Sequence, residues 1–264
     1  MSIKRNLDVW AHLIKMQLYH DLAYPSQFIC NIISSVLFTM AGPILGIVLY
    51  TNTLGFPGWS FHQFILLYGS FALWVGISST VFIAAIWRIV RAIQRGDFDK
   101  YMIRPIKPHV FVLMHGWDYD GLGRVGMGLI LIFYAALKLD LMVNITGLLT
   151  YLWVMVLGIM FTIGEIWLVL GLAFKFIKTD AVMHVFGVLF EFSKYPLTIY
   201  RGPVKFFLTF VFPVGLVAFY PASALLGFLS AKDLAIATLV SFGFFFMGYI
   251  AFWWGMRRHT SAGG

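Results

Sequence analysis

The sequence predicts an all-α integral membrane protein with one transmembrane domain over residues 1–264. Of these residues 61% are hydrophobic and only 11% are charged, whereas soluble domains carry roughly 25% charged residues. Apolar runs of about 20 residues, the length that a helix needs to cross a bilayer, recur along the chain. Basic residues gather between those runs, as in cytoplasmic loops of membrane proteins. The net charge of +8 therefore indicates cytoplasmic loops and no nucleic-acid partner.

An amphipathic helix is expected at the N-terminus, over residues 1–25. The stretch MSIKRNLDVWAHLIKMQLYHD contains no apolar core followed by a small-residue cleavage site, so we expect no cleaved signal peptide. At helical spacing one face of the stretch is apolar, and basic residues provide its polar contacts. The apolar residues are Leu7, Trp10, Ile14 and Leu18, and the basic residues are Lys4, Arg5 and Lys15. This pattern predicts a helix that lies on the membrane surface.

Four apolar runs in the first two thirds of the chain are each expected to cross the membrane. They are 26–50, 61–87, 121–137 and 145–173. The third run is short for a spanning helix unless it begins near Trp117. Between the second and third runs lies a polar segment, 88–124, whose seven basic residues place it in the cytoplasm. Basic residues near both termini place the two ends of the chain on the same side.

Three further apolar runs follow, 181–199, 206–229 and 234–254, but the charges allow only two crossings. Lys178 and Arg257 both lie among basic residues that mark the cytoplasmic side, so one run does not cross. The middle run contains two prolines, which favours a re-entrant helical hairpin over residues 203–230 that dips in from the outside. The prediction is six transmembrane helices with this hairpin before the last one. In the alternative, 181–199 is an interfacial helix, because it contains Glu191 and Lys194.

The sequence contains no pattern that predicts bond-making chemistry. It has no H-E-x-x-H, C-x-x-C or G-x-S-x-G motif and no phosphate-binding loop. His109 and His115 are the closest pair of histidines in the polar segment, but a spacing of six does not put them on one helix face. We therefore expect no catalytic residue, no metal site and no cofactor in this chain.

Three charged residues within the apolar runs are candidates for a translocation path. Glu165 lies inside the fourth run, where an ionised carboxylate in lipid costs at least a few kcal/mol. It must therefore face the bundle interior, be paired or be protonated, and a structural role and a substrate or proton role both remain open. Glu191 and Lys194 are three residues apart and are expected to pair on one helix face.

The polar segment contains a short stretch, IQRGDFDKYMIRPIKP at 93–108, that predicts a partner-binding helix. Gly96 ends the preceding helical pattern, and Asp97 and Asp99 are expected to cap a new short helix. Arg104 precedes Pro105 and stops that helix, because the residue before proline avoids helical geometry. Apolar side chains lie among the charges of this helix, as at protein interfaces. They are Phe98, Tyr101, Met102 and Ile103.

This stretch resembles the I-x-x-G-x-x-D-x-x-L-x-R-P-x-x-P segment of type-2 ATP-binding-cassette exporter permeases, the membrane subunits of bacterial ABC transporters. Three further stretches are similar to family segments in the same order. They are WSFHQFILLYG at 59–69, FPVGLVAFYPASALLG at 212–227 and WWGMRRHTSAGG at 253–264. Two residues depart from the family pattern: Met102 stands where Leu is common, and His259 stands where Tyr is expected.

The resemblance implies a permease in the bacterial inner membrane that pairs with a second copy or a sister permease. Two copies of a separate ATPase subunit would hold the ATP and Mg²⁺. Residues 1–25 would be the connecting helix, 97–103 the coupling helix that rests on the ATPase, and 203–230 would shape the exit. The implied coupling residues are Gly96, Asp97, Phe98, Asp99, Tyr101, Met102, Arg104, Pro105 and Pro108.

The substrate is expected to be hydrophobic or amphipathic, because the candidate path residues are aromatic or apolar. These residues are Phe38, Met40, Phe71, Trp74, Phe161 and Trp167. The competing interpretation of the whole chain is a gradient-driven secondary transporter that uses Glu165 as its ion site and needs no ATPase. An adjacent gene for an ATPase with a phosphate-binding loop would distinguish the two.

Overall fold

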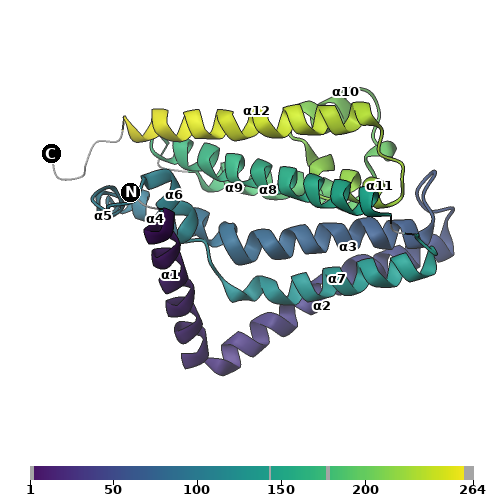
Figure 1. The fold of residues 1–264 in the computed structure, drawn as a ribbon, viewed down its shortest axis with the longest axis horizontal. Coiled ribbons are helices and arrows are strands. Elements are labelled where there is room, and N and C mark those ends of the chain that lie inside the picture. Colours follow the sequence, from purple (N-terminus) through teal and green to yellow (C-terminus); the bar gives the residue numbers. More distant parts are fainter. Residues whose placement is uncertain (1–2, 143, 177–178, 259–264) are drawn as a thin grey trace.

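The computed structural model describes residues 3–142, 144–176 and 179–258, which form helices and turns without β-strands (Figure 1). Among these residues, five helical segments are long and apolar enough to cross a membrane. They are α2 (Pro25–Asn52), α3 (Phe61–Ser78) continued by α4 (Ala84–Gln94), α7 (Leu122–Lys138), α8 (Ile145–Ala173) and α12 (Ala231–Met256). The prediction of an all-helical, multi-pass membrane protein is confirmed. A 3₁₀ turn lengthens the third span to Tyr119–Lys138, so it begins close to Trp117.

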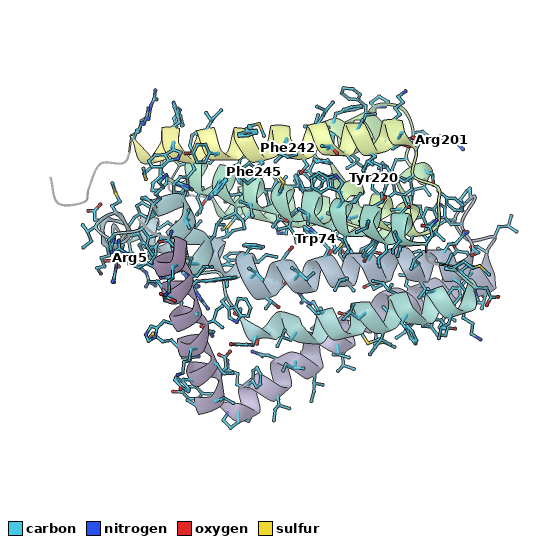
Figure 2. All side chains as sticks on the ribbon, viewed as in Figure 1. Arg5, Trp74, Arg201, Tyr220, Phe242 and Phe245 are labelled. Carbon is cyan, nitrogen blue, oxygen red and sulfur yellow. The ribbon has the colours of Figure 1, made fainter. Side chains whose placement is uncertain are left out.

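The two ends of the bundle carry different loops. One end, here named the basic end, carries α1 (Ile3–Ala23), α5 (Asp99–Met102) and α6 (Pro108–Met114) (Figure 1). The other end, here named the far end, carries the loops 53–60 and 226–230. Arg5 lies at the basic end and Arg201 at the far end (Figure 2). Lys178 and the tail from His259 onward, used for orientation and for the family resemblance, lie outside the described residues.

Three long helices that start at the far end begin with a capping side chain. Ser60 Oγ accepts a hydrogen bond from Gln63 N at 3.3 Å, and Gln63 Oε1 accepts one from Ser60 N at 2.9 Å. Asn144 Oδ1 accepts from Gly147 N at 2.6 Å, and Ser230 Oγ accepts from Asp233 N at 3.1 Å. These caps satisfy backbone donors that the first helical turn leaves free. They fix where α3, α8 and α12 enter the bundle.

Glycines spaced by two helical turns bring α8 and α12 into backbone contact. Gly164 and Gly171 on α8 face Gly248 and Gly255 on α12. A Cβ atom on Gly248 would lie 2.0 Å from the Gly164 carbonyl oxygen, and one on Gly255 would lie 2.2 Å from that of Gly171. Small residues at helix contacts permit such close approach in membrane proteins. We name this contact the α8–α12 seam.

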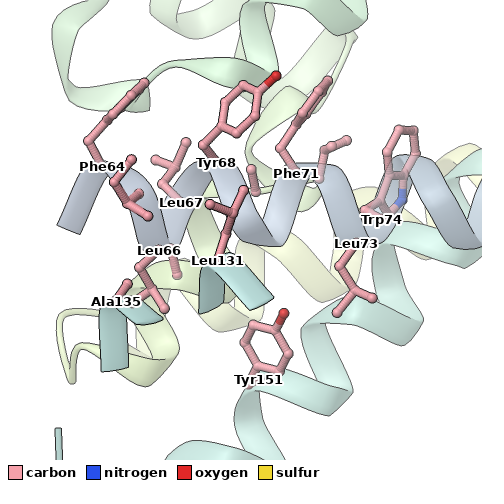
Figure 3. Packing of buried hydrophobic residues seen from close by; sticks show 14 of the residues in the cluster. Phe64, Leu66, Leu67, Tyr68, Phe71, Leu73, Trp74, Leu131, Ala135 and Tyr151 are labelled. Atoms are coloured by element: carbon pink, nitrogen blue, oxygen red, sulfur yellow. The ribbon is translucent and has the colours of Figure 1, made fainter. Parts of the chain in front are cut away.

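The same spacing recurs between α3 and α7. Gly69 and Gly76 on α3 face Gly128 and the turn at Gly121. A Cβ atom on Gly128 would lie 2.5 Å from the Leu73 backbone nitrogen. The large buried side chains of α3 then pack around this contact. The rings of Phe64, Tyr68, Phe71 and Trp74 project to one side of α3, and Leu66 and Leu73 project to the other (Figure 3).

Residues 181–199 do not form the single helix that we predicted for the fifth span. α9 (Asp180–Glu191) contains 12 residues, about 18 Å of helix, which is too short to cross a bilayer alone. Two 3₁₀ turns follow, at Phe192–Lys194 and Leu197–Ile199. The break between them falls at Pro196, because a proline disfavours helical geometry in the residue before it.

The segment around α9 nevertheless extends between the two ends of the bundle. Met183 and Phe186 of α9 pack against the core that contains Phe98 of the basic end. Near its end, Trp59 Nε1 in a far-end loop donates to Thr198 Oγ1 at 3.2 Å. The run therefore contains a short helix that breaks before Pro196, which differs from the single spanning helix that we predicted. Whether this run crosses the membrane or lies at its interface stays a prediction.

Residues 203–230 consist of short helices joined by a turn. α10 (Gly202–Phe206) continues through a π-helical turn to Val211, and α11 (Phe219–Leu225) follows a turn that begins at Pro213. Neither arm is long enough to cross a bilayer. Phe219 packs against Trp59, with centroids 5.8 Å apart, which places the arms at the far end. A re-entrant position in the membrane stays a prediction.

Candidate functional site

The predicted coupling stretch, residues 93–108, forms a compact unit at the basic end, here named the knob. Gly96 has φ +73°, a backbone conformation that glycine adopts most easily, and it turns the chain out of α4. α5 then makes a single helical turn, and Pro108 opens α6 as its first residue. Pro has no N–H to lose at this position and its φ suits a helix.

The predicted cap of this helix is wrong. Phe98 occupies the position before α5, and its side chain makes no capping hydrogen bond. The Asp97 carboxylate instead accepts a hydrogen bond from Lys100 Nζ at 2.6 Å. That ammonium lowers the pKa of the Asp97 carboxyl. The pair is exposed, so it contributes little to stability.

Phe98 is an internal anchor of the stretch, although we expected it on the partner-facing side. Its side chain is 0% exposed and belongs to a core with Ile89, Val112 and Leu170. Tyr101 is partly buried and packs against Phe111 and His115, with ring centroids 5.9 and 5.4 Å away. These aromatic contacts hold the turn of α5 against α4, α6 and α8.

The exposed side of the knob is formed by the residues that follow Tyr101. Ile103 is 81% exposed, although it is a large apolar residue. Met102, Arg104 and Pro105 are also exposed. We name Met102, Ile103, Arg104 and Pro105 the exposed tip. Ile103 was expected among the apolar residues of the stretch but was not among the implied coupling residues.

Arg88 is the centre of a polar network at the basic end. Its guanidinium donates to the backbone oxygens of His115 and Trp117, at 2.8 and 3.3 Å. It also donates to Gln17 Oε1 of α1 at 3.2 Å and lies 3.9 Å from the Asp118 carboxylate. Arg88 therefore joins α1, α4 and the loop after α6 in one polar network.

α1 packs on this end of the molecule and runs across the bundle axis (Figure 1). Its Val9, Trp10 and Leu13 contact an apolar cluster that includes Ile106 and Phe111. The predicted apolar face is only partly confirmed, because Leu7 is 54% exposed. α1 is thus a helix of the basic end that contacts the segment 88–124 directly.

The two histidines of the segment lie in separate aromatic surroundings, as their spacing predicted. The His109 ring packs against Trp167, Tyr249 and Trp253, with centroid distances of 5.7, 5.2 and 5.5 Å. His115 Nδ1 lies 2.9 Å from the Phe111 carbonyl oxygen. Burial lowers the pKa of both imidazoles. Among the described residues, no group of His, Cys, Asp or Glu is arranged to hold a metal ion.

The three candidate path residues all line one cavity between the helices. It has a volume of about 340 Å³ and is bounded by α2, α3, α4, α7, α8 and α9. Glu165 enters it from α8, and Glu191 and Lys194 enter it from the end of α9 and the turn after it. Lys194 Nζ and the Glu191 carboxylate form the predicted ion pair. The sequence could not show that α8 and the end of α9 bring these charges together.

Three of the six predicted aromatic or apolar path residues also line this cavity, namely Phe38, Phe71 and Trp74. Phe161 and Trp167 lie in the packed core instead, and Met40 is not among the lining residues. Arg124 was not predicted as a path residue, but it lines the cavity from α7 and donates to Ser79 Oγ at 3.2 Å. Only its position at the start of an apolar run could have indicated such a role.

A family model described as ABC-2 family transporter protein matches residues 36–263. No curated protein and no solved structure matches the chain. The matched range contains the cavity lining, the exposed tip and both glycine contacts, whereas α1 lies outside it.

Proposed function

Because the chain belongs to the ABC-2 family of transporter membrane proteins, we propose that it is the permease subunit of an ATP-driven exporter. Members of this family are transmembrane subunits without an ATPase domain, and they generally pair with ATPase subunits. The energy for transport would therefore come from a separate chain that holds ATP and Mg²⁺. We place the complex in the bacterial inner membrane, with the basic end in the cytoplasm.

The observation that carries the proposal is the contrast between Phe98 and Ile103 within one short turn. Phe98 is fully buried in the chain's own core, whereas Ile103 is 81% exposed. A segment that is anchored by a buried ring and presents an exposed apolar side chain suits a surface that transmits force to a partner. We propose that the exposed tip contacts the ATPase, that Phe98 and Tyr101 anchor it, and that Gly96, Pro105 and Pro108 set its backbone. Asp97 and Asp99 would lie beside the contact.

The cavity would form part of the translocation path, completed by a second copy of the chain or a sister permease. Glu165, Glu191 and Lys194 would be its charged residues. ATP binding would bring two ATPase subunits together and move the exposed tips. The Arg88 network would pass that movement to α1 and α4, and α4 lines the cavity through Ile86 and Trp87. Such coupling requires an ATPase that contacts the two states differently.

Co-purification from native membranes in mild detergent tests this function. We expect a stoichiometric ATP-binding subunit in the mass spectrum and ATPase activity in the purified complex. The variant Ile103→Asp should lose the subunit and still fold, since its side chain is exposed. Leu54→Asp is the matched control, because Leu54 is equally apolar and fully exposed in a far-end loop. If both variants retained the ATPase, the exposed tip would not be part of the contact with the ATPase.

Glu165 in the cavity favours one second candidate, a gradient-driven carrier. In that case the purified chain would form an oligomer with no ATPase partner, and transport would follow an ion gradient. Transport by proteoliposomes that contain only this chain would support the carrier. A strict requirement for the ATPase would exclude it.

A further inference from the structure

We infer that the cavity binds a hydrophobic organic cation, with the cationic group beside Glu165 and the apolar body against the aromatic wall. The inference rests on the proposed function, because it names the class of substrate that the path would take. Its support comes from three features of the cavity: an unpaired buried carboxyl group, the pairing of the other charges, and the aromatic composition of the lining.

Glu165 is the most deeply buried charged residue of the cavity. It is only 6% exposed, and among the described residues its carboxyl group has no hydrogen-bond or ion-pair partner. Thr162, one turn earlier on α8, does not supply one, because its hydroxyl donates to the Gly158 carbonyl oxygen at 3.0 Å. An unpaired carboxylate at this depth is costly, and a bound cation would offset that cost.

The other three charged residues of the lining already have polar partners or lie close to solvent. Lys194 is paired with Glu191, whose side chain is largely exposed. Arg124 is only partly buried, donates to Ser79, and lies one helical turn after Asp120. Glu165 is therefore the charged residue of the cavity with the most apolar surroundings. When Glu165 is ionised, its charge in the deepest part of the cavity has no balancing partner, which selects a cation.

Aromatic side chains form much of the lining and suit a cation with an apolar body. Tyr68, Phe71 and Trp74 present their rings from one side of α3 (Figure 3), and the Phe190 ring of α9 lies 5.0 Å from that of Trp74. Lys194 Nζ lies 5.5 Å from the Phe71 ring centroid, within the range of cation–π attraction. The wall thus already holds one ammonium group against an aromatic face.

The cavity has a size and an opening that suit such a ligand. Its volume of about 340 Å³ lies within the range of pockets for drug-sized molecules. Phe38 and Trp87 are strongly exposed at its rim. Ile83 and Trp87 also line a neighbouring depression with Arg88, Arg91 and Asp118 at the basic end. A ligand could therefore enter from the basic end or from the apolar side of the bundle.

Two ions of the same shape and opposite charge provide the test. The purified full chain, in an uncharged detergent, is equilibrated with tetraphenylphosphonium or with tetraphenylborate, and bound ligand is measured by dialysis. We expect the phosphonium to bind at least about tenfold more tightly than the borate, the difference that a charge pair in such a site commonly makes. Glu165→Gln, which preserves the shape of the side chain, should abolish this preference while the thermal stability is retained.

Arg124→Gln provides the opposite arm of the experiment. If the borate binds as tightly as the phosphonium, the cavity has no preference for cations and the inference is wrong. If Arg124→Gln alters the preference and Glu165→Gln does not, Arg124 determines the charge selectivity and the inference is also wrong. The assay requires no ATPase, so its outcome is independent of the co-purification experiment. An ATPase that co-purifies with a chain lacking cation preference would overturn only the inference. Cation preference without an ATPase partner would overturn the proposed function.

Discussion

Glycines have different surroundings in the α8–α12 seam and in the cavity wall formed by α9. On the seam, a Cβ atom on Gly248 would lie 2.0 Å from the Gly164 carbonyl oxygen. On α9, a Cβ atom on Gly187 would have nothing within 4 Å, because that position faces the cavity. One helix pair is held by backbone contact, and the other helix borders open space. The difference indicates which parts of the molecule are fixed and which are free to change.

Backbone contact leaves the seam no alternative packing, whereas the α9 wall contains the break at Pro196 and two 3₁₀ turns. A path that opens and closes needs elements with two arrangements. We therefore expect α9 to move relative to the α8–α12 seam. Four predictions test this contrast.

The largest effect is expected from Gly248→Leu. The new side chain would meet the backbone of α8, which cannot withdraw as a flexible side chain would, so the cost should exceed the usual 1–3 kcal/mol of overpacking. We expect little folded protein, measured as the monodisperse fraction in size-exclusion chromatography. Gly243→Leu on the same helix is the control, because its Cβ would meet nothing within 4 Å. Equal yields of the two variants would contradict the importance of the seam.

The next effect separates the anchor of the knob from its exposed tip. Phe98→Ala removes a fully buried ring and should lower the free energy of unfolding by about 3–5 kcal/mol. Ile103→Ala removes an exposed side chain and should change it by less than about 0.5 kcal/mol. Unfolding in denaturant, followed by tryptophan fluorescence, measures both. A small loss in Phe98→Ala would mean that the knob is not anchored by this ring.

Filling the cavity should affect transport without affecting stability. Gly187→Leu places a large side chain in the open space beside α9, so we expect an unchanged melting temperature and slower ATP-dependent transport in proteoliposomes. The comparison with Gly248→Leu is direct, because both variants exchange glycine for leucine. Unimpaired transport would show that this part of the cavity lies off the path.

The smallest effect concerns pH and the basic end. Burial lowers the pKa of His109 and His115, so the folded state binds fewer protons than the unfolded state below the ordinary histidine pKa of about 6.5. The free energy of unfolding should therefore decrease as the pH falls through that value. His109→Phe keeps a ring against Trp167 and removes the titration. Its melting temperature should depend less on pH than that of the unmodified chain, and an equal dependence would rule out His109 as a source.

The long apolar helices and the polar segment 88–124 could be predicted, because each depends on the composition of its own stretch of the chain. A run such as 145–173 is apolar enough to require a bilayer wherever it packs. The pair of Lys194 and Glu191 was predictable for the same reason, since a spacing of three residues brings side chains together on one helical turn. The resemblance to type-2 exporter permeases used short ordered motifs, and the family match confirms it.

The buried part of the site could not be predicted from the sequence, because it depends on how distant segments pack. Phe98 and Ile103 are both apolar and lie five positions apart. A single helical turn is too short for hydrophobic periodicity to show which of the two side chains is buried and which is exposed. The cavity joins Glu165 to the end of α9 and to Arg124 of α7, contacts between residues far apart in the sequence. The break in the helix at 181–199 was missed because hydrophobicity measures whether a segment prefers lipid, and it does not measure whether the backbone stays helical.

Hydrophobicity and charge act on each segment separately, so the linear chain is sufficient to specify an all-helical membrane protein and the places where its helices begin. Burial and contact arise between segments, so they exist only once the helices have packed. The glycine contacts illustrate both levels. Their spacing of seven residues is written in the chain, but whether a glycine meets a backbone, as Gly248 does, or a cavity, as Gly187 does, depends on what lies opposite it in space.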